Sequence, residues 1–528
     1  MRRSEKISDA IGQVDEEIVA EAEEIRLNGT EKNTAINKRL GKKVWIPALS
    51  AAACTAVVCG ALVLGGVGNG GDISTDGSET TSSDTFTEMT DGDYGNLLYL
   101  FDHVETLAEA EYPVMAKYPN EDDCFDENGV WQDELAALYY YPWEEQGVER
   151  RQAGSLLVYD SLTGFVMSTS NEFLTGSDGE NRVYSPGSAY MALAMLAETA
   201  DGNSRYQILE LLGVDSIEAL REQAENMWKA NYRNDGATTS VLANSLWLNE
   251  GVTFNVGTIN RLADSYHASS YRGDMSSEEM TAALRDWLNK QTGGLLGDAA
   301  ENVALDPETV MSLCSTVYFR AKWDYQFSAA NNEFKTFHSP GGDIEAEFMN
   351  NTDEYGPYYW GEDYGAVCLE FADRGAMWLI LPDEDKTVDD VLASREYLDM
   401  INTGYGWEKS KSIIVHNSVP KFDVSSELTL AEGLKRLGIT DVFDSGVSDF
   451  TPLTDDMDGI FVSDAKQAAR VQIDEEGCTA AAFTQMLEAG AALPPEDEIY
   501  FTLDRPFIFV IQSDTNQPLF IGTVYNPL

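Results

Sequence analysis

The sequence is poor in basic residues. It carries 35 lysines and arginines against 90 aspartates and glutamates, which gives a formal net charge of −55. Such an excess of negative charge repels nucleic acids and anionic polysaccharides, so we expect no nucleic-acid or polyanion partner. A solvated acidic surface that keeps an exposed protein soluble also explains the charge, which therefore identifies no target by itself.

Cysteine and histidine are also scarce. The six cysteines include no Cys-x-x-Cys pair, and the four histidines lie far apart in the chain. Neither a zinc site nor a disulfide framework is indicated, and we expect no metal and no cofactor. The G-x-S-x-G, Walker and H-E-x-x-H motifs are absent as well, so we do not expect an enzyme.

Residues 44–67, VWIPALSAAACTAVVCGALVLGGV, contain no charged residue. Their length suits a helix that crosses a bilayer, whereas the core of a signal peptide is normally shorter. Four basic residues crowd the N-terminal side of this segment: Lys38, Arg39, Lys42 and Lys43. The positive-inside rule then predicts a single-pass membrane protein with a cytoplasmic N-terminus and an extracytoplasmic body. Secretion after cleavage near Ala61 and a lipid anchor at Cys54 are the alternatives.

Two polar segments flank this predicted transmembrane helix. Residues 1–43 place isoleucine and valine at helical spacing among acidic residues. This pattern predicts a cytoplasmic amphipathic helix that dimerises or docks a partner, or a short soluble helix without a partner. Residues 68–97 consist largely of Gly, Ser, Thr and Asp, a composition typical of a disordered stalk because it cannot bury a core.

The rest of the chain alternates helical and strand patterns. YMALAMLAETA at 190–200 and AALRDWLNKQ at 282–291 predict helices, while runs such as MSLCSTVYF and AMWLILP predict strands. The strands come in several separated blocks, which predicts an α+β body with more than one sheet. Residues 98–154 precede the recognisable part of this body as an N-terminal extension.

Several motifs in residues 155–528 resemble, in order, those of one family. They are NRVYSPGSAYMALAML at 181–196, LANSLWL, YFRAKWDYQF, LILPDE, VPKFDV with LKRLGITDVF, FTLDRPFIFVI at 501–511, and PLFIGTVYNP. Together they resemble the serpins, a family of serine protease inhibitors. The resemblance implies a fold of three β-sheets and about nine helices with an exposed reactive loop. The lone N-terminal anchor favours a bacterial member.

The stretch EEGCTAAAF resembles the hinge of the serpin reactive loop. In inhibitory members the hinge slides between two strands of the central sheet after the loop is cut. Small side chains let a strand enter a packed sheet without clashes, whereas bulky or charged side chains would block it. The hinge residues implied are Glu475, Glu476, Gly477, Cys478, Thr479, Ala480, Ala481 and Ala482.

Alternate residues of the inserted strand should face the core. Counted from Cys478, the inward residues are compatible with burial until Glu488. A buried unpaired carboxylate is costly, so either Glu488 lies near the open end of the sheet or the loop inserts less completely than in typical inhibitors.

The scissile bond implied by the family's loop spacing is Ala491-Ala492. A count back from Leu493-Pro494-Pro495 gives the same bond. Alanine before the cut suits a serine protease with a small apolar specificity pocket, elastase-like or subtilisin-like. Trypsin-like enzymes require Arg or Lys, which the loop lacks. The partner implied is a target protease held as a covalent acyl-enzyme.

The resemblance also implies the residues at which the central sheet opens. Trp323 matches the tryptophan of the breach, the region where insertion starts, and Ser185 and Ser188 match the serines of the shutter beneath the sheet. Ser315 and Gln467 stand where the family usually has asparagine and histidine, and both keep hydrogen-bonding capacity.

Three functions are therefore open from the sequence. The first is a membrane-tethered suicide-substrate inhibitor of serine proteases. The second is a non-inhibitory binding protein with the serpin fold, and the third is a membrane sensor of proteolysis that signals through residues 1–43. The small hinge residues favour the first function.

Overall fold

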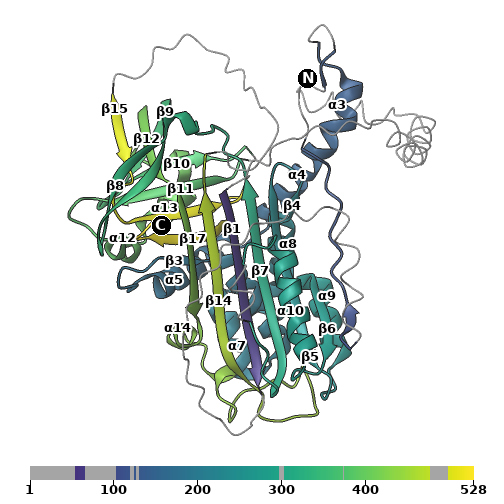
Figure 1. Ribbon diagram of the computed structural model, residues 1–528. Helices are drawn as coiled ribbons and strands as arrows, with labels where there is room; N and C mark the ends of the chain where they lie inside the picture. Colours follow the sequence, from purple (N-terminus) through teal and green to yellow (C-terminus); the bar gives the residue numbers. More distant parts are fainter. Residues whose placement is uncertain are drawn as a thin grey trace, which may run out of the picture. The chain divides into compact units, whose positions relative to one another are not determined.

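An eight-stranded sheet forms the centre of the molecule (Figure 1). The computed structural model describes residues 54–65, 103–118, 124–126, 130–296, 303–372, 374–475 and 497–528, all within one compact unit. Strand order in the sheet is β13 (Phe422–Thr429), β14 (Phe461–Ile473), β1 (Cys54–Gly65), β7 (Thr309–Ala321), β5 (Thr239–Asn249), β6 (Ala268–Gly273) and β2 (Glu105–Ala108), with the short β4 (Arg233–Asn234) paired to β5.

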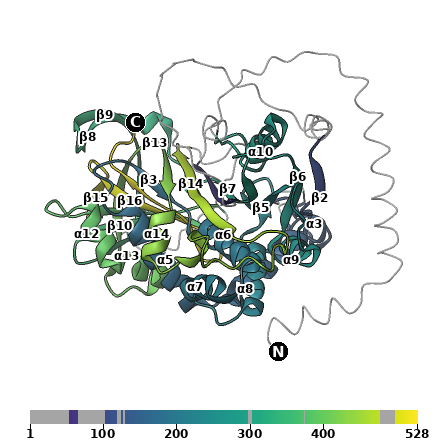
Figure 2. The same ribbon diagram turned by 90° about the horizontal axis from the view of Figure 1, so that it is seen from below.

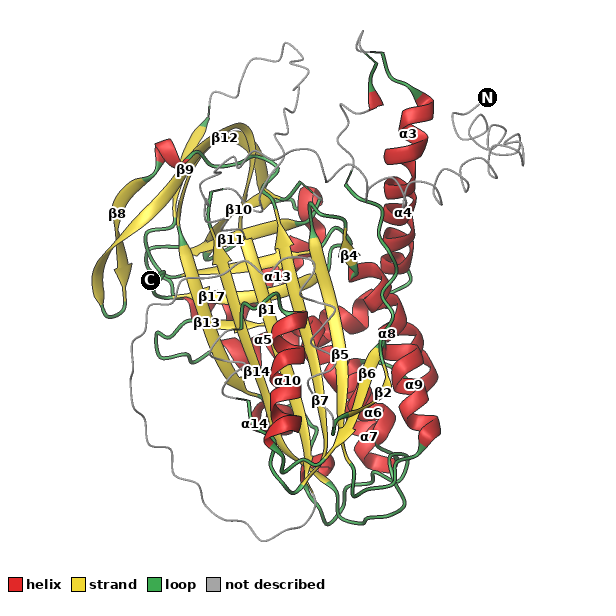
Figure 3. Ribbon diagram, turned by 45° about the vertical axis from the view of Figure 1, so that its right-hand side comes forward, coloured by secondary structure: helices red, strands yellow, loops and turns green. Residues whose placement is uncertain are grey.

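The central strands are apolar on both sides because helices cover both faces of the sheet. Nearly every residue of β5 and β7 is buried. Helix α10 (Glu278–Gln291) packs on one face through Leu284, Trp287 and Leu288. The opposite face meets the main core, with helices α6 (Pro186–Thr199), α7 (Gly202–Leu212), α8 (Ile217–Asn231) and α9 (Val256–Tyr266) (Figures 2 and 3).

A second path of nine strands completes the β-structure. Its order is β15 (Glu498–Thr502), β12 (Ser410–Pro420), β9 (Gly342–Trp360), β10 (Tyr364–Glu370), β11 (Ala376–Pro382), β16 (Phe507–Gln512), β17 (Pro518–Val524) and β3 (Arg182–Tyr184), with β8 (Glu333–Ser339) paired to β9. Strand β9 pairs with β8 and β12 over long stretches but with β10 only through its last three residues. This junction divides the path in two, which makes three sheets with the central one, as expected.

The described residues contain eleven α-helices, against about nine expected. The two extra helices, α3 (Asp133–Tyr139) and α4 (Tyr141–Ser155), belong to the N-terminal extension. The remaining ones not yet named are α5 (Tyr159–Leu174), α12 (Val388–Ser394), α13 (Glu396–Thr403) and α14 (Ala431–Arg436).

Residues 54–65 depart from the predicted transmembrane helix. They form strand β1, which is antiparallel to both β14 and β7. An uncharged apolar segment satisfies its backbone polar groups equally well inside a helix or between two strands, and its small and β-branched residues suit a buried strand. Residues 44–53, 66–67, 1–43 and 68–97 lie outside the described residues. No helix within the described part of the chain is long and apolar enough to cross a bilayer.

Candidate functional site

The candidate site is the slot between β7 and β14, the two strands that the reactive loop would have to separate. In this structure β1 fills the slot. Thr55 lies opposite Gln472 and Arg320 at one end, and Leu64 lies opposite Val462 and Met311 at the other. The central sheet therefore accepts an additional antiparallel strand at this place, with ladders to both neighbours.

The predicted shutter residues lie together beneath the slot. Ser185 is the N-cap of α6, and its side chain accepts a hydrogen bond from the backbone N–H of Ser188. Pro186 follows at the first helical position, where a missing N–H costs nothing, so the sequence Ser-Pro starts the helix here. All four predicted side chains, of Ser185, Ser188, Ser315 and Gln467, are completely buried.

These contacts tie α6 to both walls of the slot. The Gln467 side chain on β14 accepts a hydrogen bond from the N–H of Ser185 at 2.9 Å and donates one to its carbonyl oxygen at 3.0 Å. The Ser188 hydroxyl donates to the carbonyl oxygen of Ser315 on β7 at 3.0 Å. The position of β1 that lies opposite both Gln467 and Ser315 is Gly60.

The predicted breach residue, Trp323, lies just beyond the end of β7. Its indole N–H donates to the carbonyl oxygen of Asp474 at 2.8 Å, and its ring stacks on Phe371 with 5.0 Å between centroids. Phe327 contacts the indole edge-on, and its own N–H donates to the carbonyl oxygen of Glu475. Trp323 thus binds the carbonyl group of Asp474, which lies between the end of β14 and the start of the predicted loop.

Glu475 is the one predicted hinge residue that the structure describes. It is 9% exposed, forms an ion pair with Lys421 at 2.7 Å, and accepts a hydrogen bond from Asn332. Burial alone would raise the pKa of Glu475, but the hydrogen bonds from Lys421, its own backbone N–H and Asn332, together with the charge of Lys421, outweigh burial and hold the pKa below its usual range. Glu475 therefore anchors the base of the loop through a charged carboxylate that pairs with Lys421.

The predicted loop ends at β15 on the other side. The carbonyl oxygen of Asp497 accepts a hydrogen bond from the N–H of Ile414, and its carboxylate pairs with Lys411. Strand β15 then runs parallel to β12. The other predicted hinge and bond residues lie outside the described residues: Glu476, Gly477, Cys478, Thr479, Ala480, Ala481, Ala482, Ala491 and Ala492.

Sequence reasoning gave no role to the extension, yet the structure packs it tightly on the body. Strand β2 pairs with β6 at the edge of the central sheet. Tyr112 stacks on Trp228 and Tyr232, with ring centroids 5.8 and 5.5 Å apart. The Tyr232 hydroxyl donates to the carbonyl oxygen of Pro113. The extension therefore covers an edge that would otherwise offer unpaired backbone groups.

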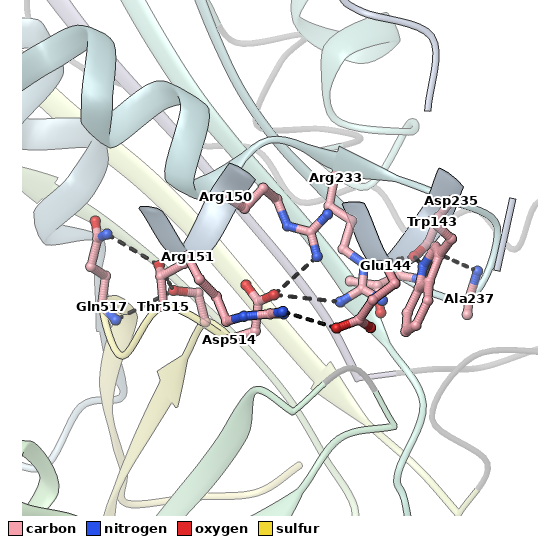
Figure 4. A network of polar contacts seen from close by, with 12 residues as sticks. Trp143, Glu144, Arg150, Arg151, Arg233, Asp235, Ala237, Asp514, Thr515 and Gln517 are labelled. Carbon is pink, nitrogen blue, oxygen red and sulfur yellow. Dashed lines mark hydrogen bonds and ion pairs between the residues drawn. The ribbon is translucent and has the colours of Figure 1, made fainter. Parts of the chain in front are cut away.

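A buried polar network fixes helix α4 of the extension (Figure 4). Arg150 pairs with Asp514 at 3.0 Å, and their side chains are only 6% and 9% exposed. Arg233 lies 3.9 Å from Asp514 and 2.7 Å from Asp235, which also accepts a hydrogen bond from the Trp143 indole. Burial opposes ionisation of Asp235, but Arg233 and the hydrogen bonds lower its pKa overall. No sequence motif marks these residues, because the partners come from distant parts of the chain.

Comparison with known proteins agrees with this architecture. The model of the family described as serpin (serine protease inhibitor) matches residues 160–527. Serpin-ZX of Arabidopsis thaliana is 28% identical over 375 residues, 67% of this chain and 94% of the relative. Leukocyte elastase inhibitor A of Mus musculus is 27% identical and covers 66% of this chain and 93% of the relative.

The same family emerges from the solved structures. The native state of the thermophilic serpin tengpin superposes with a TM-score of 0.60 at 27% identity, and the match covers 69% of this chain and 93% of tengpin. The family match spans most of the chain and contains the slot, the shutter and the breach described above. The chain therefore belongs to the serpin family, whose members are protease inhibitors and not enzymes.

Proposed function

We propose that this serpin is an extracytoplasmic suicide-substrate inhibitor of serine proteases with a small apolar specificity pocket, elastase-like or subtilisin-like. The observation that carries the proposal is the slot itself. The central sheet holds an added antiparallel strand between β7 and β14, and the chain leaves β14 at Glu475 directly beside that slot. Insertion of a cut loop requires both features.

The chemistry belongs to the target protease. Its serine oxygen attacks the carbonyl carbon of Ala491, the bond to the nitrogen of Ala492 breaks, and that nitrogen leaves with a proton from the protease histidine. The loop then remains joined to the protease through an ester at Ala491. If the loop enters the sheet before water attacks the ester, the attached protease is carried away from its starting position and distorted.

Strand addition provides the driving force for this movement. Each inserted residue gains backbone hydrogen bonds to β7 or β14. The anchored base favours insertion from the Glu475 end, because Trp323 and Lys421 fix the start of the loop at the top of β14.

The specificity proposal rests on the residue before the cut. A methyl side chain at Ala491 fits a shallow apolar pocket and leaves the acidic pocket of trypsin-like enzymes empty. The relative named leukocyte elastase inhibitor A supports the same specificity.

We place the inhibitor on the outer face of a membrane, with residues 44–67 as the anchor, because that segment is uncharged and follows a basic cluster. Co-sedimentation of the full chain with phospholipid vesicles, lost on removal of residues 1–67, tests the anchor.

The test of inhibition uses residues 98–528, which contain the whole family match and lack β1. This protein is incubated with an elastase-like and a subtilisin-like protease, and the products are separated on denaturing gels and identified by mass. We expect a boil-stable complex and a released peptide that begins at Ala492. Clean cleavage at Ala491-Ala492 without a complex would contradict inhibition and favour the non-inhibitory binding protein.

A further inference from the structure

The strand that fills the slot comes from the chain's own N-terminal part. Strand β1 enters at the breach end, where Thr55 lies opposite Gln472, and runs to Gly65, opposite Phe461. A reactive loop that leaves β14 at Glu475 and folds back beside it would enter at the same end and run in the same direction. The two segments therefore require the same space in the same orientation.

The start of β1 also resembles the loop hinge, with three of five residues identical. Residues 54–58 are Cys-Thr-Ala-Val-Val, and residues 478–482 are Cys-Thr-Ala-Ala-Ala. The alternate positions of β1 that begin at Cys54 lie opposite residues of the main core on β7 and β14, apart from the shutter pair at Gly60. These positions are Cys54, Ala56, Val58, Gly60, Leu62 and Leu64, against Cys478, Ala480, Ala482, Thr484, Met486 and Glu488 in the loop.

The two series differ most at their last position. The loop would bring Glu488 to the place where β1 has Leu64, between Met311 and Val462. Both neighbours are buried hydrophobic residues, so a carboxylate brought between them would lose hydration. At the shutter, Gly60 takes the place of the larger Thr484. The sequence of β1 therefore suits the far end of the slot better than the sequence of the loop does.

We propose that residues 54–65 are an internal competitor of the reactive loop, which fills the slot and makes the chain a substrate instead of an inhibitor. This inference rests on the proposed inhibitory function. While β1 is in place, a loop cut at Ala491-Ala492 has nowhere to insert, and water completes hydrolysis of the acyl-enzyme. The chain inhibits only when residues 54–65 leave the slot and are bound in another apolar environment.

A bilayer is such an environment. The segment that forms β1 lies inside the uncharged stretch 44–67, which is long enough to span the hydrocarbon core as a helix. One segment cannot be in the slot and in the bilayer at once. Membrane anchorage would therefore empty the slot and switch the inhibitor on, and loss of the membrane would switch it off.

The test compares the full chain with its Leu62→Asp variant in buffer without lipid. Leu62 lies opposite the buried Leu313 and Ala465, so aspartate there opposes strand insertion and leaves the reactive loop unchanged. Ser83→Asp adds the same charge outside β1 and is the control. Each protein is mixed with the elastase-like and subtilisin-like proteases, and the yield of boil-stable complex is measured.

We expect at least a tenfold higher yield of complex with Leu62→Asp than with the wild type or with Ser83→Asp.

Hydrogen exchange gives a readout that needs no protease. The amides of residues 312–317 on β7 that face β1 should exchange faster in Leu62→Asp because the slot has lost its strand, whereas those that face β5 should not change. A boil-stable complex formed in equal yield by all three proteins, with equal exchange, would contradict competition by β1 and leave the proposed function standing.

Failure of the proposed function looks different. In that case full-length Leu62→Asp forms no complex with either protease, although exchange on β7 still differs between this variant and the wild type. That outcome would overturn competition between β1 and an inserting loop, since no loop inserts.

Discussion

The side chain of Gln467 holds Ser185 by both its backbone groups, with hydrogen bonds of 2.9 Å from the N–H and 3.0 Å to the carbonyl oxygen. This double contact joins β14 to the start of α6. Ser188 makes the corresponding contact to β7 through the carbonyl oxygen of Ser315. Helix α6 therefore holds the two walls of the slot from below, and insertion of a strand has to take place over this linkage.

Replacement of Gln467 by leucine should weaken the body. The N–H of Ser185 would stay buried without its partner, which costs about 1–3 kcal/mol of unfolding free energy. Urea unfolding of residues 98–528 measures the loss. Gln472→Leu, at a partly buried position of the same strand, is the control and should change the unfolding free energy much less. Equal losses in both variants would show that the contact to Ser185 is not the cause.

The buried pair Arg150–Asp514 should hold the extension to the body. Arg150→Met removes the nearer of the two arginines beside the Asp514 carboxylate, and we expect a loss of about 3 kcal/mol of unfolding free energy. Arg151→Met is the control, because Arg151 pairs with Glu144 at 3.2 Å with both side chains about a third exposed, and such pairs contribute about 1 kcal/mol or less. Thermal unfolding of both variants distinguishes the two cases, and equal effects would contradict a structural role for the network.

The pH dependence of stability should report Glu475. Its pKa is lower in the folded protein than in the unfolded chain, so its contribution is complete above the unfolded pKa, about 4.3, and is lost as pH falls through the lower folded value. Glu475→Gln should therefore flatten the decline of unfolding free energy below about pH 5. Glu308→Gln, at an exposed carboxylate, should leave the slope unchanged. An unaltered slope in Glu475→Gln would exclude the carboxylate as an acid-sensitive anchor.

Two substitutions in the loop separate insertion from bait recognition. Ala482→Arg should convert residues 98–528 into a plain substrate, because arginine cannot enter the closed sheet. Ala482→Val is the matched control and should keep trapping, since β1 carries Val58 at the corresponding position. Full trapping by Ala482→Arg would rule out the insertion mechanism.

Ala491→Arg should instead redirect the inhibitor to trypsin-like enzymes, because the bait side chain then matches an acidic pocket. The rates of complex formation with a trypsin-like and an elastase-like protease measure this exchange. If the elastase-like enzyme were still trapped at the original rate, the bait residue would lie elsewhere in the loop.

Much of the fold and of the site could be predicted from sequence. Helix α6 contains the helical run predicted at 190–200 as far as Thr199, and the four shutter residues implied by the resemblance to the serpins lie together beneath the slot. Trp323 likewise contacts the start of the loop. These site residues were implied by the resemblance of whole motifs to the serpins, whereas the local patterns indicated only which runs form helices and strands.

Two features could not be predicted in this way. The apolar composition of the uncharged stretch that contains β1 indicates that it is removed from water. A bilayer helix and a strand inside a sheet both meet this condition, so composition alone does not distinguish them. The contact between Arg150 and Asp514 joins residues 364 positions apart, and nothing in either local sequence names the partner. Both features depend on which surfaces meet in the folded chain.

The most direct test of the account is whether a cut loop becomes a strand of the central sheet. Residues 98–528 are cleaved between Ala491 and Ala492, and the unfolding temperature is compared with that of the intact protein. Insertion between β7 and β14 adds two ladders of hydrogen bonds and buries the alanines of the hinge, so we expect the cleaved protein to unfold more than about 10 °C higher. An equal or lower unfolding temperature after cleavage would contradict insertion, and with it the inhibitory mechanism.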